Sequence, residues 1–378
     1  MSTAAAIERV RADACPGAVT LHQAADGGLA RIRIPGGLVS GPQLIALADA
    51  TRDLGDGRME LTSRGNVQIR ALAPGAGDEL ARRLVASGLL PSVTHERVRN
   101  IVASPLAGID NDGDLTGLVR ELDRALCERP ALSELSGRFL FAIDDGRGDV
   151  SALGADVTIV LTSGGARLPT MAVPRARAVE AAMAIAHAFL DERAAQDSQA
   201  WRIDELEGGR TAVYGRARQT LRVEAAEPLP ALATGAEPAG VVGQPDGQHA
   251  LVALAPLGRL TAGQARLLAA HAGERGVRIT PWRSVVVPDL DDAGPLATAA
   301  WKCGMGVEAG SRWYRVSACT GRPGCAKSLA DVQADAAAAA DRWHGRSVHW
   351  SGCERRCGRP RGTEVDVIAT AEGYTVSE

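Results

Sequence analysis

The chain has no long hydrophobic run. Its longest alanine-rich helical segment, around Val179–Leu190, falls short of the roughly 20 apolar residues of a membrane span and is bounded by Arg177 and Glu192. The N-terminal segment lacks the apolar core of a secretion signal, because Glu8 and Arg9 interrupt its short alanine run. We therefore expect a cytoplasmic globular protein whose cysteines are reduced.

The chain also has little net charge and almost no lysine. Its formal net charge is −3 over 378 residues, which gives no reason to expect nucleic acid or a membrane surface as a partner. Of the 42 basic side chains only Lys302 and Lys327 are lysines. Arginine is therefore used heavily, including in the segments that look like binding sites.

Four of the seven cysteines form two pairs near the C-terminal end. Five residues separate Cys319 from Cys325, and three separate Cys353 from Cys357. Each pair lies in a glycine-containing stretch, where the backbone can fold tightly around a ligand. Four thiolates from two such loops suit an iron–sulfur cluster.

Other interpretations of these cysteines are possible. Structural zinc also takes four cysteines, but its usual pairs are more closely spaced. Disulfides need an oxidising compartment, which the N-terminal segment does not indicate. For the remaining cysteines, Cys15, Cys127 and Cys303, we expect buried or incidental thiols.

An internal repeat determines the predicted architecture. Residues 37–69 and 258–287 each have the pattern strand, capped helix, strand, turn, strand, with Ser40 and Thr261 at the expected N-caps. Each unit has too few strands to close a core alone, so we predict that the two half-modules pack side by side as an approximate twofold pair. A longer α/β stretch follows each of them.

The predicted boundaries follow from this repeat. They are a first half-module at 20–88, a first α/β lobe without paired cysteines at 89–226, a linker at 227–247, a second half-module at 248–300 and a second lobe with the four cysteines at 301–378. In the first lobe, Phe139–Ile143 and Val157–Leu161 are predicted strands, and Val179–Leu190 is a predicted helix. The fold class is therefore α+β.

Two short motifs complete a resemblance that covers nearly the whole chain. Together with the repeat and the cysteine spacing, the segments Leu61–Gln68 (LTSRGNVQ) and Val98–Ile101 (VRNI) resemble the sirohaem-containing nitrite and sulfite reductase family. The resemblance implies ferredoxin-like half-modules with a tetrapyrrole macrocycle at their interface. It also implies a 4Fe-4S cluster beside the macrocycle, held by Cys319, Cys325, Cys353 and Cys357.

Two segments depart from the reductases of that family. Where they carry a second lysine that binds and protonates the small oxyanion, this chain has Leu140, although Arg138 keeps one cation in the segment. The loop Cys353–Cys357 also lacks the Pro-Asn usual in sulfite reductases. These departures favour an oxygenase branch of the family, in which the tetrapyrrole is substrate. A sirohaem-dependent nitrite or sulfite reductase is the alternative, and a non-catalytic zinc or iron–sulfur protein ranks last.

Arginine side chains are the candidates for gripping the carboxylate arms of a tetrapyrrole. A guanidinium can pair bidentately with a carboxylate, and Arg64 and Arg99 match arginines of the family's motifs. The candidate substrate-binding residues are Arg64, Asn66, Gln68, Arg70, Arg99, Asn100, Arg138 and Arg283. Arg283 is included because Trp282-Arg283 is interpreted as the counterpart of Ser63-Arg64. Any one of them could instead be a solvated surface residue.

Two histidines are weighed as part of the site. For His349, which precedes the Cys353 loop, a satisfied core histidine is favoured over a hydrogen bond to a cluster sulfur or to substrate. For His95, next to Glu96, a polar loop position is favoured over an iron ligand.

The resemblance also implies a reaction and its reagents. It is an oxygen-dependent hydroxylation of precorrin-3A at C20 with γ-lactone formation, in cobalamin biosynthesis, with NADH as formal reductant and the cluster as electron relay. A mononuclear non-haem iron is implied as well, but no two-histidine, one-carboxylate set is recognisable in the sequence. Because the dinucleotide fingerprint is missing, we expect an external reductase or ferredoxin as electron donor. The internal duplication favours a monomer.

Overall fold

The computed structural model describes residues 13, 15–111, 113–229, 238–343, 345–360 and 362–378. By its internal contacts the chain divides into two compact units. The first, here called the first-lobe unit, comprises the segment up to Pro16, Arg33–Gly37 and Pro91–Ala236. The second, the cysteine unit, comprises Gly17–Ile32, Leu38–Leu90 and Glu237–Glu378. Both half-modules therefore belong to the unit that carries the paired cysteines.

Two antiparallel five-stranded sheets form the half-module pair. The first has the order β1 (His22–Ala24), β2 (Gly27–Ile32), β5 (Val67–Leu72), β4 (Arg58–Leu61), β13 (Arg259–Thr261). The second has the order β11 (Gly240–Gly243), β12 (His249–Leu254), β15 (Ser284–Leu290), β14 (Val277–Ile279), β3 (Leu38–Val39). Each sheet takes its last strand from the other half-module, because β13 pairs with β4 and β3 pairs with β14. The half-modules are thus joined by exchanged strands.

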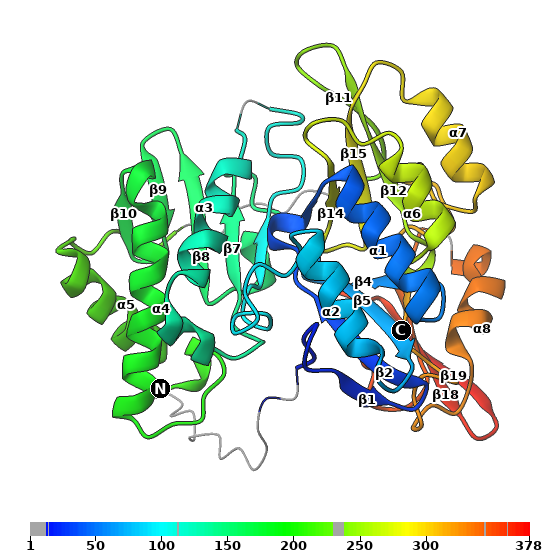
Figure 1. The fold of residues 1–378 in the computed structure, drawn as a ribbon, viewed down its shortest axis with the longest axis horizontal. Helices are drawn as coiled ribbons and strands as arrows, with labels where there is room; N and C mark the ends of the chain where they lie inside the picture. The colour runs from blue at the N-terminus through cyan, green and yellow to red at the C-terminus, as the bar shows by residue number, and fades with distance from the viewer. Residues whose placement is uncertain (1–12, 14, 112, 230–237, 344, 361) are drawn as a thin grey trace. The chain divides into compact units, whose positions relative to one another are not determined.

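Helices cover these sheets in a repeated arrangement. They are α1 (Gly41–Leu54) and α2 (Ala76–Ala86) in the first half-module, and α6 (Ala262–Ala269) and α7 (Gly294–Lys302) in the second. Helix α1 packs on α6 (Figure 1). A Cβ atom at Gly41 would lie 3.1 Å from the carbonyl oxygen of Ala269, so glycine permits this close approach.

The predicted N-caps are confirmed. The Ser40 hydroxyl accepts a hydrogen bond from the N–H of Gln43, and the Thr261 hydroxyl accepts one from the N–H of Gln264. In both cases the glutamine side chain accepts from the N–H of the cap residue, which completes a capping box. Two helices that pack against each other therefore begin with the same device.

The first-lobe unit is built on one mixed sheet. Its order is β10 (Met171–Val173), β9 (Gly165–Leu168), β8 (Val157–Thr162), β7 (Phe141–Asp144), β6 (Ile101–Ala103), and β6, β7 and β8 are parallel. Its helices are α3 (Thr116–Cys127), α4 (Ala178–Ala195) and α5 (Gly209–Leu221). The strands and the helix predicted here are observed as β7, β8 and α4, the helix with one more turn at its end.

Taken in chain order, the lobe with the paired cysteines repeats the arrangement of the first lobe, in which three parallel strands are followed by an antiparallel one. Its sheet runs β16 (Val316–Ala318), β17 (Val348–Ser351), β18 (Val365–Thr370), β19 (Gly373–Ser377), with the first three strands parallel and the last antiparallel. Helix α8 (Val332–Ala338) covers it. Its core includes Val348, Val365 and the indole rings of Trp343 and Trp350. The duplication seen in the half-modules thus extends to the lobes.

The remaining elements are short. The 3-10 helices are η1 (Pro35–Gly37), η2 (Pro130–Glu134), η3 (Ser151–Leu153), η4 (Arg175–Arg177), η5 (Ile203–Glu205), η6 (Pro256–Gly258) and η7 (Ala340–Trp343). Strand β11 lies inside the stretch predicted as a linker, 227–247, of which 230–237 fall outside the described residues. Among the described helices, none combines the length and the apolar character needed to cross a membrane.

Candidate functional site

The two cysteine loops leave the carboxyl ends of neighbouring parallel strands. Cys319 directly follows β16, and Cys353 follows β17 after Gly352. The strands pair in parallel with Ala318 opposite Trp350, so both loops start at the same edge of the sheet. The N–H of Cys319 donates to the carbonyl of Trp350 at 2.8 Å, and the N–H of Gly352 donates to the Cys319 sulfur at 3.2 Å. The topology therefore brings together cysteines that are distant in sequence.

Close backbone packing joins the two loops. The N–H of Leu329 donates to the carbonyl of Gly352 at 2.8 Å. A Cβ atom at Gly352 would lie 1.9 Å from the Ser328 hydroxyl oxygen, so no other residue fits without moving the loops. The glycine between β17 and Cys353 is thus required by the contact between the loops.

The pKa of Cys319 depends on the other cysteine sulfurs through electrostatic interaction. Burial raises the pKa of Cys319, and the thiols of Cys357 and Cys325 lie near enough to raise it further. The N–H groups of Gly352 and Gly321 act in the opposite direction by donating to the sulfur. Thiolates gathered in this way need a cationic partner, which the iron of a cluster supplies when bound.

The spacing of the cysteines argues against a single zinc ion. Within the part of the chain that the structure describes, only Asp144, Asp145 and Asp149 form a group of three or more potential ligands whose atoms lie within 4.8 Å of one another. Four thiolates around one zinc lie roughly 3.8 Å apart, as follows from a Zn–S distance of about 2.3 Å. The wider spacing of the cysteines suits a cluster better.

His349 fixes the second cysteine loop. This side chain is fully buried on β17, and its Nε2 donates to the carbonyl of Cys357 at 3.2 Å. Its Nδ1 then accepts from the hydroxyl of Ser317 at 2.9 Å. Burial lowers the pKa of His349 to about 4, with the nearby Arg283 guanidinium adding to the effect, so the ring is neutral at neutral pH. The favoured interpretation, a satisfied core histidine, is confirmed.

Ser351 offers an unused hydrogen-bond donor beside the cysteines. Its side chain is fully buried, and its hydroxyl has no hydrogen-bond partner among the described residues. It lies two positions after His349 on β17, so both side chains point to the same face of the sheet. A buried hydroxyl without a partner is costly, and a cluster sulfide would supply an acceptor. The residues present therefore fit an iron–sulfur cluster.

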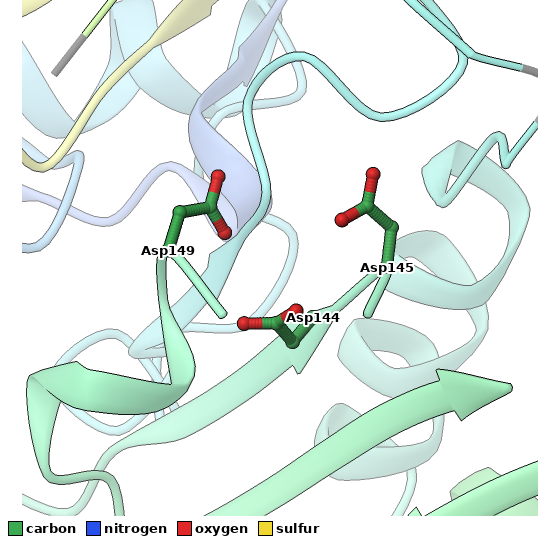
Figure 2. Close-up of side chains that lie close together, drawn as sticks. All are labelled: Asp144, Asp145 and Asp149. Carbon is green, nitrogen blue, oxygen red and sulfur yellow. The ribbon is translucent and has the colours of Figure 1, made fainter. Parts of the chain in front are cut away.

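The three aspartates lie at the end of β7 in the first-lobe unit, with Asp144 as its last residue and Asp145 and Asp149 in the turn after it (Figure 2). Asp144 accepts three backbone N–H groups from the turn that follows it, at 2.9 to 3.0 Å. Asp145 pairs with Arg147 at 2.7 Å, and Asp149 accepts from the Ser104 hydroxyl at 2.6 Å. Burial raises the pKa of Asp149 to about 6 against that hydrogen bond. The carboxylates are thus used to organise a turn, and the group contains no histidine for a non-haem iron.

The candidates of the first half-module lie around the turn between β4 and β5. The N–H groups of Arg64 and Asn66 donate to the Thr62 hydroxyl at 3.3 and 3.1 Å, which shapes the turn. The Arg64 side chain is half-buried, and Asn66 is buried. The Gln68 side chain accepts from Arg31 and donates to a carboxylate oxygen of Glu60. Gln68 therefore takes part in side-chain pairing across the sheet.

The expected correspondence of Arg283 with Arg64 is wrong by one position. In the first turn the N–H of Gly65 donates to the carbonyl of Thr62, and in the second the N–H of Arg283 donates to the carbonyl of Thr280. Gly65 and Arg283 also share a left-handed backbone, with φ of 64° and 63°. Trp282 therefore stands where the first half-module has Arg64. Matching the two arginines shifts the repeat by one residue, because the register of these turns is set by their hydrogen bonds and not by residue type.

Arg70 has partners within the cysteine unit. Its Nε and Nη2 donate to the two oxygens of Asp26 at 3.0 Å each, and Nη2 also donates to the carbonyl of Gly324 at 2.9 Å. A substrate carboxylate would have to displace Asp26 from this fork.

The candidates of the first-lobe unit are brought together around the Arg-Asn motif. Arg99 is buried and donates to both oxygens of Asp123 at 2.7 Å, so it too has a carboxylate partner. The Asn100 side chain donates to the carbonyl of Gly137 at 2.7 Å, beside the exposed Arg138. The Arg138 guanidinium lies over the Trp201 ring at 4.9 Å.

His95 is held within the same unit. Its Nδ1 lies within hydrogen-bonding distance of the hydroxyls of Ser92 and Thr94, and its Nε2 lies 3.1 Å from the carbonyl of Arg129. Both ring nitrogens are therefore occupied, in agreement with a polar loop position.

A pocket of about 640 Å³ in the cysteine unit borders the Cys319–Cys325 loop. Both half-modules line it, and its lining includes four arginines, Arg58, Arg70, Arg259 and Arg322. Arg259 pairs with Asp56 at 2.7 Å, while Arg322 donates through Nε to the carbonyl of Ser328. Gln333, also in the lining, donates to the carbonyl of Cys319 at 2.7 Å. The pocket wall thus touches the backbone of a cysteine.

Sequence reasoning missed Arg58, Arg259 and Arg322. For Arg322 a signal existed, because it lies between two paired cysteines. Arg58 and Arg259 lie on the two strands of the exchanged pair β4 and β13, whose register puts Arg58 against Thr261 and Arg259 against Glu60. That pairing spans about half the chain and leaves no local trace in the sequence.

Comparison with known proteins agrees with this architecture. The nitrite/sulfite reductase ferredoxin-like half domain matches residues 22–87 and 242–294, which overlap the segments 20–88 and 248–300. The chain is 27% identical over 409 residues to a precorrin-3B synthase of Sinorhizobium sp, covering 98% of this chain and 83% of the relative. It is also 27% identical over 400 residues to a ferredoxin–nitrite reductase of Synechococcus elongatus, covering 90% and 76%.

The fold is found again in a solved structure. The NirA protein of Mycobacterium tuberculosis has a TM-score of 0.72 and 21% sequence identity, covering 92% of this chain and 73% of that chain. The α+β fold with ferredoxin-like half-modules and the resemblance to the nitrite and sulfite reductases, with precorrin-3B synthase among them, are confirmed.

Proposed function

We propose that this protein is an oxidoreductase of the precorrin-3B synthase type, which hydroxylates precorrin-3A at C20 with dioxygen and forms a γ-lactone during cobalamin biosynthesis. The observation that carries the proposal is the arginine-lined pocket directly beside the Cys319–Cys325 loop. Similarity to a precorrin-3B synthase along 98% of the chain supports the same reaction.

In this proposal Cys319, Cys325, Cys353 and Cys357 hold a 4Fe-4S cluster. When bound, the cluster supplies single electrons, which the activation of dioxygen requires and ordinary side chains cannot provide. The chain itself positions the thiolates through the two loops at the edge of β16 and β17. NADH remains the formal reductant, and a separate reductase or ferredoxin is the predicted donor.

The pocket is the proposed place of the tetrapyrrole. Its volume lies in the range of small-molecule sites, and precorrin-3A carries acetate and propionate arms that pair with guanidinium groups. Arg58 and Arg322 are exposed at this pocket and form no ion pair with any described carboxylate, so both are available to the arms. Asp26 and Asp56 already neutralise Arg70 and Arg259. Arg64 and Asn66 of the same unit remain predicted contacts, and Asn100 and Arg138 stay predictions from the sequence.

A sirohaem-dependent nitrite or sulfite reductase is the second candidate. The similarity to ferredoxin–nitrite reductases favours it. Against it stands Leu140, which replaces the oxyanion-binding lysine and is 3% exposed in the first-lobe core. Its N–H donates to the buried Asp156 at 2.9 Å, so this backbone position has a structural role of its own.

The experiment that separates the two is spectroscopic and isotopic. Anaerobically purified protein is assayed for iron, sulfide and haem, and is then given precorrin-3A, a reducing system and ¹⁸O-labelled dioxygen. A broad absorption shoulder without haem bands, followed by a product carrying labelled oxygen, is expected. Intense haem bands together with turnover of nitrite or sulfite would replace the proposal by the second candidate.

Three further predictions from the sequence stay part of the proposal. They are the cytoplasmic location, the monomeric state and the mononuclear non-haem iron. For that iron the described residues offer no grouped pair of histidines with a carboxylate.

A further inference from the structure

We infer that each half-module anchors one cysteine loop through one arginine: Arg70 holds the Cys319–Cys325 loop, and Arg283 holds the Cys353–Cys357 loop. Both are then positioning residues for the cluster, although the sequence suggests them as substrate contacts. The inference rests on the proposed cluster, but the loop contacts that carry it belong to the protein alone.

Arg70 reaches the first loop from strand β5. Its side chain is 6% exposed and forms a forked pair with Asp26, which is 14% exposed. Two donors hold the carboxylate, and Nη2 also donates to the carbonyl of Gly324 at 2.9 Å, one residue before Cys325. A bidentate pair fixes the orientation of a guanidinium, so its remaining donor direction is fixed as well.

The loop backbone lies directly against this ion pair. A Cβ atom at Gly324 would lie 2.6 Å from the Thr320 methyl carbon and 3.0 Å from both Arg70 Nη2 and an oxygen of Asp26. Only glycine fits between the loop and the pair. The steric contact is independent of the hydrogen bond, and both place the residue before Cys325 on the first half-module.

Arg283 reaches the second loop from the turn between β14 and β15. Its Nη2 donates to the carbonyl of Gly358 at 3.1 Å, one residue after Cys357. Arg283 has a φ of 63°, a conformation that non-glycine residues rarely adopt. The N–H groups of Trp282 and Ser284 donate to the Thr280 hydroxyl and hold this turn.

The second half-module also makes room for the Arg283 side chain. Gly258, in η6, has a φ of 78°, and a Cβ atom there would lie 2.4 Å from Cδ of Arg283. Only a residue without a Cβ atom leaves room at position 258 for the aliphatic part of the Arg283 side chain. In each half-module an arginine thus donates to a carbonyl next to a paired cysteine and packs closely on a glycine, Gly324 for Arg70 and Gly258 for Arg283. The twofold pair of half-modules sets where the two loops lie.

Hydrogen exchange in the metal-free, full-length chain tests the two anchors separately. Arg70→Lys is expected to speed exchange in peptides from residues 319–329 about five-fold, and Arg283→Lys to do the same for residues 351–359, as the loss of one hydrogen bond predicts. Each variant should leave the other loop at the wild-type rate. Arg52→Lys and Arg266→Lys are matched controls, because they alter ion-paired arginines on α1 and α6 of the same half-modules.

The pattern across the two loops decides the outcome. Exchange that rises in the predicted loop alone supports the anchors. Exchange that rises equally in both loops, or in neither, overturns them. A variant that unfolds raises exchange in α3 and α4 of the first-lobe unit as well, and is then replaced by Gly324→Ala, whose added Cβ should displace the first loop only.

A redox measurement tests the connection to the cluster. Arg70→Gln leaves the Asp26 charge unbalanced next to the loop, so the midpoint potential of the cluster should become more negative. Asp26→Asn removes the nearer of the two carboxylates beside the guanidinium, leaving Glu60 at 4.0 Å from Nε, and should make the potential more positive. Shifts of the same sign overturn the placement of this pair beside the cluster. A wild-type chain without iron and sulfide refutes the proposed cofactor, whereas the exchange experiment still decides whether the arginines hold the loops.

Discussion

At the scale of single residues, the cysteines have assigned roles that substitution can separate. Cys325→Ser should abolish the visible absorption of the cluster and lower its iron and sulfide content, because serine is a poor ligand for iron in such clusters. Cys303→Ser is the matched control, since Cys303 is exposed and lies outside both loops. Retention of the full cluster in Cys325→Ser would show that the ligand set is different.

Ser351 allows a sharper test of how the site fits a cluster. In Ser351→Ala the midpoint potential should shift to more negative values, because a hydrogen bond to a cluster sulfur stabilises the reduced state. The metal-free protein should not lose stability, since the hydroxyl has no partner among the described residues that the change would leave unpaired. The measurements are redox titration of the cluster and chemical denaturation of the metal-free chain.

A second buried hydroxyl provides the control for Ser351. Thr51, in α1, is fully buried, and its hydroxyl also has no hydrogen-bond partner in the part of the chain that the structure describes. Thr51→Val should leave the potential unchanged. If both substitutions shift the potential alike, the effect of Ser351 is not a contact with the cluster.

The arginines show what sequence reasoning reached at this scale. The sequence predicts that guanidinium groups crowd the site, with Arg70 and Arg283 among them. It did not find their partners, because Asp26 lies 44 positions from Arg70 and Gly324 lies 254 positions away. A residue type suggests the chemistry that it can perform, whereas its role depends on neighbours that the fold brings in.

At the scale of elements, the loop after β7 carries a pH-dependent stability. The pKa of Asp149 is raised by burial from 3.8 in the unfolded chain to about 6, so its proton is bound more tightly in the folded state. Its ionisation therefore opposes folding, and stability falls as pH rises from about 4 to about 6. The full effect is roughly 3 kcal/mol, an upper estimate at 1.36 kcal/mol for each pH unit.

Denaturation of the wild-type chain and of Asp149→Asn at pH 4.5 and pH 7 measures this contribution. The wild-type chain should lose more stability over that interval than the variant, which has no proton to release. Equal losses in the two proteins would mean that Asp149 titrates normally in the folded loop. Asp204→Asn is a suitable control, because the neighbouring Arg210 guanidinium lowers the pKa of that carboxyl.

The sequence predicted elements well where the interactions that form them join residues close in the chain. A hydroxyl at Ser40 or Thr261 caps a helix with groups only three residues away, so the capping pattern could be found in the sequence. Strands β3 and β13 have two and three residues and pair with the other half-module. Their short segments carry no periodicity, and their partners are distant, so the exchange was not predictable.

At the scale of the whole molecule, the duplication organises the cysteine unit more completely than the sequence indicates. The repeat predicted two half-modules side by side, and the exchange of β3 and β13 makes each half-module a part of the other's sheet. The lobes repeat one another too, with three parallel strands followed by an antiparallel one. The sequence predicts an α/β lobe after each half-module but does not indicate that the lobes repeat one another, because one lobe has aspartates, and the other cysteines, after its middle strand.

This exchange predicts that neither half of the chain builds the site alone. A fragment of residues 238–378 retains all four paired cysteines, but it lacks β3 at the edge of its own sheet and the anchor that Arg70 provides. We expect this fragment to bind little iron and sulfide. Co-expression with a fragment of residues 1–229 should restore the cluster, because the two fragments recover both sheets by strand pairing.

The co-expressed pair also separates the anchor from the missing sheet edge. With Arg70→Lys in the N-terminal fragment, the strands still pair and the fragments should still copurify, while exchange in residues 319–329 rises as in the intact chain. A fragment of residues 238–378 that holds a complete cluster alone would show that the second half-module and its lobe form an independent site. The first half-module would then have no part in positioning the cysteines. The four ligands would have assembled without β5, the strand that carries Arg70.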